Sequence, residues 1–269
     1  MTLFISLLAV ISALGTGPFH QPEIPAGKTD TLKVWNVVAD RISVDPLGQF
    51  YMINNGTLIK YDALGDSVFS WSEPQTGRIT LIDSGEPMRI LVYQKDFNLL
   101  RFLNNRLAPI SGPIRLDDLG ITVPLAISIS HQGGFWVVDG SSFRLRQIDK
   151  QNETIVESRP LNLPSGAGSP DYRLTESGDQ VFLLIPGLEI QVFDLFANLI
   201  KKIPLKVPSF NVYGTRILLT YPDKITLWKD PVTAEETLAT SSGATFREAC
   251  LLQNRLLIRT AEKVFMINR

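Results

Sequence analysis

The chain has 269 residues, of which 44% are hydrophobic and 20% are charged, and this globular composition excludes an intrinsically disordered protein. Because 26 basic residues nearly cancel 27 acidic ones, no overall field attracts nucleic acid or an anionic membrane. The single cysteine, Cys250, excludes an internal disulfide and a multi-cysteine metal site, and its apolar surroundings in EACLLQ predict an inert, packed thiol.

The N-terminal segment differs from the rest of the sequence. Residues 3–15, LFISLLAVISALG, form an uncharged apolar run that is shorter than the roughly 18–20 residues of a membrane-spanning helix. Ala13 and Gly15 place small residues where a signal peptidase cleaves, although no Lys or Arg precedes the run. We therefore predict a signal peptide over residues 1–15, a linker over residues 16–30 and a periplasmic or extracellular mature protein without a transmembrane span. The alternative is a buried strand or helix of the mature fold.

From residue 31 onward, short runs rich in Val, Ile, Leu, Phe and Tyr alternate with Gly, Asn, Asp and Pro, which is typical of strands and turns. The most apolar runs begin 40, 45, 46, 36 and 39 residues apart, and each has a strand before and after it. A repeat of about 40 residues with four strands is what a β-propeller blade requires. The six runs are FYMIN from Phe50, ILVYQ from Ile90, FWVVD from Phe135, VFLLI from Val181, ILLTY from Ile217 and LLIRT from Leu256.

The two ends of the sequence complete each other. Five repeats carry a fourth strand, which in the second repeat is expected over residues 106–112 and is followed by a short helical turn in IRLDDLG. The sixth repeat ends at Arg269 after three strands, and residues 31–39 supply the missing outer strand. This pairing closes a ring and removes its open edges. We predict an all-β, six-bladed β-propeller of four-stranded antiparallel blades over residues 31–269.

The third strand of every repeat ends in Asp or Asn. Such a side chain at a strand end commonly starts a turn by bonding the backbone that follows it. We interpret these six residues as turn residues rather than catalytic carboxylates: Asp62, Asn104, Asp149, Asp194, Asp230 and Asn268.

The first repeat, ISVDPLGQFYMINNGTLIKYDALGD, resembles an NHL-type propeller repeat, and ISISHQGGFWVVD in the third repeat matches it in part through Gly133, Gly134 and Asp139. The chain is similar in this respect to NHL-repeat and TolB-like six-bladed propellers. That resemblance implies one of three classes: protein-binding scaffolds, RNA-binding modules or metal-dependent lactonases of the gluconolactonase type. The match in the first repeat rests on Asp45, Gly48, Tyr51, Tyr61, Asp62 and Gly65.

The sequence contains few of the residues that the enzyme classes require for catalysis. A lactonase of this type holds a divalent cation with a Glu of the first blade and Asn and Asp of later blades, whereas Asp40 and Asp45 stand in ADRISVDP as simpler turn residues. A Ser-His-Asp hydrolase requires a histidine, and the sequence offers only His20 in the linker and His131 in a turn. No Gly-x-Ser-x-Gly motif occurs either. We therefore predict no catalytic residue, no metal site and no cofactor.

RNA binding requires a basic face studded with aromatic residues. Lys201 and Lys202 fall instead on an outer strand, where lysines commonly discourage association between sheet edges. No nucleic-acid partner is predicted.

Binding of a protein is the remaining class. In a propeller, the turns between the second and third strands share one face with the connections between blades, and loops on a rigid scaffold commonly carry function. We predict a non-enzymatic protein-interaction or scaffold propeller of the bacterial cell envelope. The alternatives are an envelope assembly held through the blade edges and a metal-dependent lactonase or similar hydrolase. The candidate partner-binding residues are Asn54, Asn55, Lys95, Asp96, Asp118, Asp139, Asp223 and Glu262.

Overall fold

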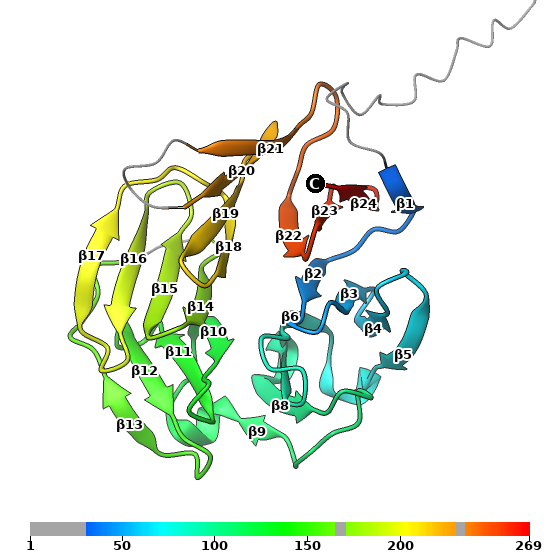
Figure 1. Ribbon diagram of the computed structural model, residues 1–269. Coiled ribbons are helices and arrows are strands. Elements are labelled where there is room, and N and C mark those ends of the chain that lie inside the picture. The colour runs from blue at the N-terminus through cyan, green and yellow to red at the C-terminus, as the bar shows by residue number, and fades with distance from the viewer. Residues whose placement is uncertain (1–30, 165–170, 230–234) are drawn as a thin grey trace, which may run out of the picture.

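The computed structural model describes residues 31–164, 171–229 and 235–269, in which 24 strands form six four-stranded antiparallel sheets. The sheets are arranged around a central axis as the blades of a propeller (Figure 1). The predicted signal peptide and linker, residues 165–170 and residues 230–234 with the predicted turn residue Asp230 lie outside these ranges. Among the described residues, no helix has the length and apolar character that crossing a membrane requires.

The six central strands lie within one residue of the predicted runs, and the N-terminal outer strand begins at the predicted residue and ends four residues before the predicted end. Blades 1 and 2 consist of β2 (Arg41–Val44), β3 (Phe50–Asn54), β4 (Thr57–Tyr61) and β5 (Ser67–Trp71), and of β6 (Ile79–Asp83), β7 (Ile90–Gln94), β8 (Leu99–Leu103) and β9 (Ile114–Arg115). Blades 3 and 4 consist of β10 (Pro124–Ile129), β11 (Phe135–Asp139), β12 (Arg144–Ile148) and β13 (Thr154–Glu157), and of β14 (Arg173–Ser177), β15 (Gln180–Ile185), β16 (Glu189–Asp194) and β17 (Leu199–Ile203). Blades 5 and 6 consist of β18 (Ser209–Tyr213), β19 (Arg216–Thr220), β20 (Lys224–Trp228) and β21 (Glu236–Thr240), and of β22 (Glu248–Leu252), β23 (Arg255–Arg259), β24 (Val264–Asn268) and β1 (Thr31–Trp35).

Blade 6 closes the ring as the sequence predicts. Its sheet has the order β1-β24-β23-β22, so the N-terminal strand forms the outer edge of a blade made by the C-terminal end. Val34 pairs with Phe265 and Trp35 with Val264, and blue β1 lies beside dark-red β24 in Figure 1. The pairing joins the two ends of the protein in one cooperative unit and leaves no gap in the ring.

The outer strand of blade 2 corrects the prediction. Strand β9 covers only Ile114–Arg115, and within the expected segment, residues 106–112, only Pro109 forms a bridge, an isolated one with Leu103. Pro109 and Pro113 have no backbone N–H group, so a ladder of hydrogen bonds cannot continue through them. The expected helical turn is present as a 3-10 helix, η3 (Leu116–Leu119).

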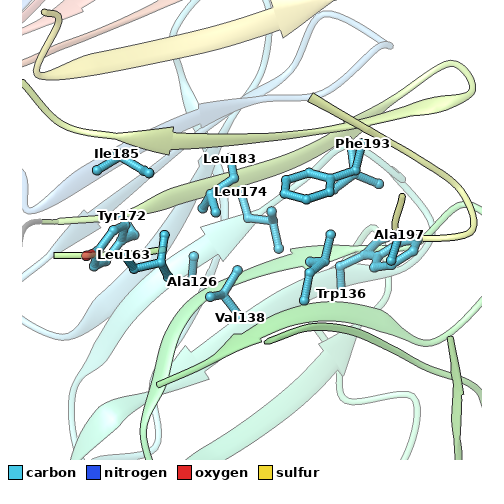
Figure 2. Close-up of a cluster of buried hydrophobic side chains, with 12 residues drawn as sticks. Ala126, Trp136, Val138, Leu163, Tyr172, Leu174, Leu183, Ile185, Phe193 and Ala197 are labelled. Carbon is cyan, nitrogen blue, oxygen red and sulfur yellow. The ribbon is translucent and has the colours of Figure 1, made fainter. Parts of the chain in front are cut away.

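The hydrophobic core is divided into six clusters, and each cluster lies between two neighbouring blades. Between blades 3 and 4, Trp136 and Val138 of β11 face Leu174 of β14 and Leu183 of β15 (Figure 2). A central strand therefore buries both of its faces, which explains why the central runs are apolar at nearly every position. Each fully buried side chain of this size contributes about 1.5–3 kcal/mol relative to an exposed one.

The Asx turns predicted at the ends of the third strands are confirmed for four blades. The Oδ1 atom of Asp62, Asn104, Asp149 and Asp194 accepts hydrogen bonds from the backbone N–H groups two and four residues later, at 2.8–3.0 Å. The residue three positions on has a positive φ, which is met by glycine at Gly65. At Asn268 no such hydrogen bonds occur among the described residues, and the backbone N–H of Arg269 donates to the carbonyl oxygen of Asn254.

Candidate functional site: the two mouths of the central channel

The inner strands β2, β6, β10, β14, β18 and β22 line a channel along the propeller axis. At the end of the channel where these strands begin, two cavities of about 400 and 650 Å³ share Arg41 and Asp171, and we call this end the top mouth. At the other end a cavity of about 470 Å³ contains His131 and Glu176, and we call it the bottom mouth. Ser43 lies in the wall of both a top and the bottom cavity, so the two mouths belong to one channel.

An ion-pair network crosses the top mouth. The Nη2 atom of Arg41 lies 2.6 and 2.7 Å from the two carboxylate oxygens of Asp171. Arg41 begins the inner strand of blade 1 and Asp171 precedes that of blade 4, so this pair joins opposite blades across the channel. Arg173 donates through Nη1 to Glu248, and Arg259 donates through Nε to the other oxygen of Glu248 at 3.0 Å.

Glu248 is the buried centre of this network. It also accepts the backbone N–H of Ile42 at 3.1 Å. Burial alone would raise the pKa of Glu248, but the positive charges of Arg173, Arg41 and Arg259 outweigh burial and lower the pKa to about 2. The carboxylate is therefore ionised at neutral pH, and its surplus of cationic neighbours leaves the mouth positive.

Three further cations surround the top mouth. Arg78, Lys95 and Arg247 are exposed, and none has a carboxylate within 4.0 Å among residues 31–164, 171–229 and 235–269. With Arg41, Arg173 and Arg259 they make six cationic residues in the walls of the two top cavities, against four carboxylates. Those carboxylates belong to Asp40, Asp83, Asp171 and Glu248.

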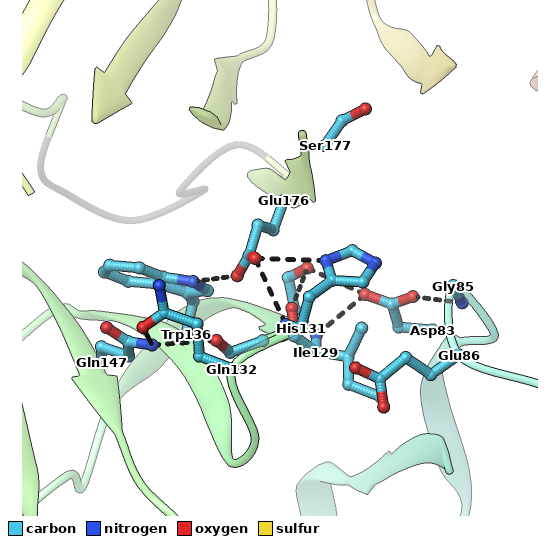
Figure 3. Close-up of polar contacts among 12 residues, drawn as sticks. Asp83, Gly85, Glu86, Ile129, His131, Gln132, Trp136, Gln147, Glu176 and Ser177 are labelled. Carbon is cyan, nitrogen blue, oxygen red and sulfur yellow. Dashed lines mark hydrogen bonds and ion pairs between the residues drawn. The ribbon is translucent and has the colours of Figure 1, made fainter. Parts of the chain in front are cut away.

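The bottom mouth contains a carboxylate held by donors that carry no permanent charge (Figure 3). Glu176 of blade 4 accepts the Nε1–H of Trp136 at 2.5 Å through Oε2, and its Oε1 lies 3.2 Å from both the backbone N and the ring Nδ1 of His131. Only 1% of the Glu176 side chain is exposed, against 44% of the His131 side chain. Glu176 therefore ties blade 4 to blade 3 and orients an imidazole whose other nitrogen makes no hydrogen bond with the described part of the protein.

The bottom mouth has the opposite charge from the top mouth. Its cavity is lined by the carboxylates of Asp45, Asp83 and Glu176 and by a single cationic residue, Arg216. Asp45 accepts hydrogen bonds from two turn N–H groups and from the hydroxyl of Tyr51 at 2.9 Å. Burial, aided by Asp45, raises the pKa of Tyr51, so its hydroxyl remains a donor. Asp45 is thus a turn residue, as predicted.

Polar groups of the inner strands bridge all six blade boundaries. These contacts use side chains that line the channel, so much of its polarity serves to hold the ring together. Successive bridges join Ser43 with Ser84, Asp83 with Ile129, Glu176 with His131, Ser177 with Gly214, Asn211 with Ala249 and Glu248 with Ile42.

The predicted partner-binding residues lie on the face that carries the top mouth, which we call the top face. Asp96 shows the relation, because its Oδ2 accepts the backbone N–H of Arg78 in the connection that leads into β6. The eight predicted residues are distributed over five blades. Asn54 and Asn55 lie at the β3–β4 turn, Lys95 and Asp96 in the 3-10 helix η2 (Lys95–Phe97) between β7 and β8, Asp118 in helix η3, Asp139 at the end of β11, Asp223 in the β19–β20 turn and Glu262 in the β23–β24 turn.

Two of these residues differ from the rest. Asp139 is buried, and its carboxylate accepts the N–H of Ser141 at 2.9 Å and the hydroxyl of Ser142 at 2.7 Å, so it shapes its own turn. Of the eight predicted partner-binding residues, only Lys95 contributes to the wall of a channel cavity. The other six are exposed or half-buried around the mouth.

Sequence reasoning missed the charged network of the top mouth. Its signal was a charged residue at the start of three inner strands, in RISVD, YRLTES and FREACLL. A charge at a strand end reads as solvent-exposed unless the ring geometry that brings the strands together is known. The missed residues are Arg41, Asp171, Arg173, Glu248 and Arg259.

The ligand set of the lactonase alternative is not assembled in the described ranges. There, no group of three or more His, Cys, Asp or Glu side chains is placed to hold a metal ion. Cys250 is buried between blades 1 and 6, and burial raises the pKa of its thiol, as expected of packing without reactivity.

Solved propellers are similar to this protein in structure, whereas no protein-family model and no curated protein sequence matches it. A catalytically inactive histidine-to-alanine variant of virginiamycin B lyase from Staphylococcus aureus, determined with quinupristin, has a TM-score of 0.57 at 12% identity, over 85% of this chain and 79% of the lyase. A streptogramin B lyase has a TM-score of 0.58 at 12% identity, over 90% of this chain and 96% of the lyase. The WD40 domain of Neurospora crassa Pan2 has a TM-score of 0.62 at 9% identity, over 92% of this chain and 97% of the domain.

These likenesses show the propeller fold alone, because propellers of one architecture host unrelated functions. The resemblance of the first repeat to NHL-repeat and TolB-like propellers remains a prediction.

Proposed function

We propose that the protein is a non-enzymatic interaction propeller of the bacterial cell envelope that binds an acidic segment of a partner protein on its top face. The observation that carries this proposal is the excess of cationic residues at the top mouth, together with the three exposed cations Arg78, Lys95 and Arg247 that have no carboxylate partner in the described part of the protein. The envelope location rests on the predicted signal peptide.

The two ends of the channel give the binding a direction. Complementary charge steers encounter and fixes orientation more than it adds raw affinity. An acidic segment approaching along the axis is attracted by the top mouth and repelled by the bottom mouth, where three carboxylates face one arginine. Asp171 and Glu248 already hold Arg41 and Arg173 in place, so ordering these two side chains costs little conformational entropy when the partner binds.

Site-specific photo-crosslinking in the cells that make the protein tests this proposal. A photoreactive residue at Asn55 or Glu262 on the top face is expected to capture one partner protein, whereas the same residue at Asn152, in an exposed turn at the opposite end of blade 3, is not. The double variant Arg78→Glu/Arg247→Glu is expected to lose this capture, while Arg216→Glu, at the bottom mouth, is expected to keep it.

The proposal fails if the same protein is captured equally at Asn55 and Asn152, or if the Arg78→Glu/Arg247→Glu variant captures it as well as the natural protein does. Capture that is lost only with Arg216→Glu would place the interface at the bottom mouth.

An enzymatic function is the second candidate, and the pairing of His131 with Glu176 favours it. In the neutral tautomer with Nδ1–H toward the carboxylate, Nε2 is a hydrogen-bond acceptor, and a positioned imidazole of this kind contributes about 10²–10⁴-fold to proton transfer. The lyases with a similar fold are enzymes by name. We expect no turnover of ester substrates, lactone substrates or quinupristin by the full-length protein. Turnover that His131→Gln abolishes without unfolding would establish the enzyme.

A further inference from the structure

We propose that Arg41 and Arg173 form a carboxylate-binding subsite that the protein's own Asp171 fills in the free state. On binding, a carboxylate of the acidic partner segment displaces Asp171 from the two arginines. This inference rests on the proposed function and names both the group recognised at the top mouth and the group that it replaces.

The carboxylate of Asp171 lies against Arg41 and Arg173 as a bound carboxylate ligand would. Arg41 holds both oxygens of Asp171 at 2.6 and 2.7 Å, and Nη2 of Arg173 lies 3.6 Å from the same carboxylate. The guanidinium groups lie beneath the carboxylate: 24% of the Arg41 side chain and 16% of the Arg173 side chain are exposed, against 57% of the Asp171 side chain. A carboxylate that sits on the solvent side of two partly buried arginines is open to exchange.

Asp171 and Glu248 differ in how easily another carboxylate can replace them in the network. Glu248 is buried among Arg173, Arg259 and the backbone of Ile42, and these three partners hold it more firmly than Asp171 is held. An ion pair as exposed as that of Asp171 changes an equilibrium constant by no more than about fivefold. The partner therefore loses little affinity by competing with Asp171, whereas Glu248 keeps the arginines positioned throughout the exchange.

The arginines remain cationic in either state. Burial opposes the charge of Arg41, but Glu248 and Asp171 raise its pKa above the usual value. The Nε atom of Arg173 is buried and has no hydrogen-bond partner among the described residues, so this side chain has unused donor capacity. The planar guanidinium matches a carboxylate better than an ammonium group does, which favours an Asp or Glu side chain or a C-terminal carboxylate as the ligand.

The space for an acidic segment lies on both sides of Asp171. Asp171 and Arg41 are common to the two top cavities, of about 400 and 650 Å³. Lys95 lines one of these cavities, and Arg78 and Arg247 line the other. A segment whose one carboxylate replaces Asp171 thus brings its flanking acidic residues against unpaired cations.

A binding assay with a fluorescein-labelled deca-glutamate peptide and the full-length protein tests the exchange. We expect Asp171→Asn to lower the Kd about fivefold, because it removes the internal competitor, and Arg41→Gln to raise the Kd about tenfold or more. The matched control is Asp117→Asn, which removes the same charge from an exposed position of helix η3 on the same face. Asp117 has no ion pair in the described structure, and the asparagine keeps an oxygen that accepts from Asn98, so we expect the Kd to change less than about twofold. In the background of Arg41→Gln, adding Asp171→Asn should give no gain.

The outcomes separate this inference from the proposed function. If Arg78→Glu/Arg247→Glu abolishes peptide binding while Asp171→Asn matches Asp117→Asn or weakens binding, the acidic partner stands and the exchange at Asp171 is refuted. If the peptide does not bind at low salt to the natural protein or to Asp171→Asn, both ideas fail. Thermal unfolding of each variant confirms that it is folded, so that a lost signal reports on binding.

Discussion

The two mouths of the channel each hold a buried glutamate between blades, but with different hydrogen-bond donors. Each contains a buried glutamate that joins neighbouring blades: Glu248 is held by guanidinium groups, and Glu176 by an indole, a backbone N–H and an imidazole. The guanidinium donors leave the top mouth with a surplus of positive charge, whereas donors without a permanent charge leave the bottom mouth acidic. The polar channel of this propeller therefore contains two kinds of group: those that join the blades and those that are available to a partner. The charge of the hydrogen-bond donors distinguishes the two kinds.

The largest expected effect is the loss of the charge of Glu248. Glu248→Gln keeps the shape of the side chain but leaves Arg173 and Arg259 partly buried without their counter-charge, which is expected to lower the free energy of unfolding by about 3 kcal/mol. Urea denaturation monitored by tryptophan fluorescence measures it. A loss below about 1 kcal/mol would show that the top network is no more than a surface feature.

The contribution of Glu248 to stability should vanish in acid. The pKa of this group is about 2 in the folded protein and about 4.5 when it is unpaired, so its charge stabilises the fold fully above about pH 4.5, and that contribution is lost as the pH falls toward 2. The difference in unfolding free energy between the natural protein and Glu248→Gln is therefore expected to shrink over this window. A difference that stayed constant from about pH 7 to about pH 2.5 would contradict the assigned charge state, and Asp223→Asn, which carries no such pair, provides the flat reference.

Glu176 at the bottom mouth should be less sensitive than Glu248. Glu176→Gln removes a charge that faces no permanently charged donor, and the new amide NH₂ must face either Trp136 or His131. One donor then lacks an acceptor, for a loss of about 1–2 kcal/mol. The same urea titration compares the two mouths, and a loss equal to that of Glu248→Gln would remove the distinction between charged and neutral donors.

The division between what the sequence predicts and what it does not follows the range of the interactions. The turn at Asp62 is readable because its acceptor bonds reach only two and four residues along the sequence. The closure by β1 is readable because the last repeat lacks one strand. The Arg41–Asp171 pair joins residues 130 positions apart on opposite blades, so no local pattern reveals it. The outer strand of blade 2 differs from the prediction because Pro109 interrupts the expected segment and Pro113 follows directly after it.

The smallest expected effect lies at the bridge between blades 1 and 2, where both partners are neutral. The hydroxyls of Ser43 and Ser84 are 2.7 Å apart, and Ser84 is fully buried. Ser43→Ala should lower the free energy of unfolding by about 1 kcal/mol, because it leaves the Ser84 hydroxyl buried without its partner. The double variant Ser43→Ala/Ser84→Ala should recover most of that loss, since removing both partners leaves no unsatisfied group. No such recovery is expected at the top mouth. Removing Glu248 together with one arginine there still leaves a second guanidinium group without its counter-charge. If a double variant at the top mouth recovered as fully as the serine pair, the two ends of the channel would be held together in the same way.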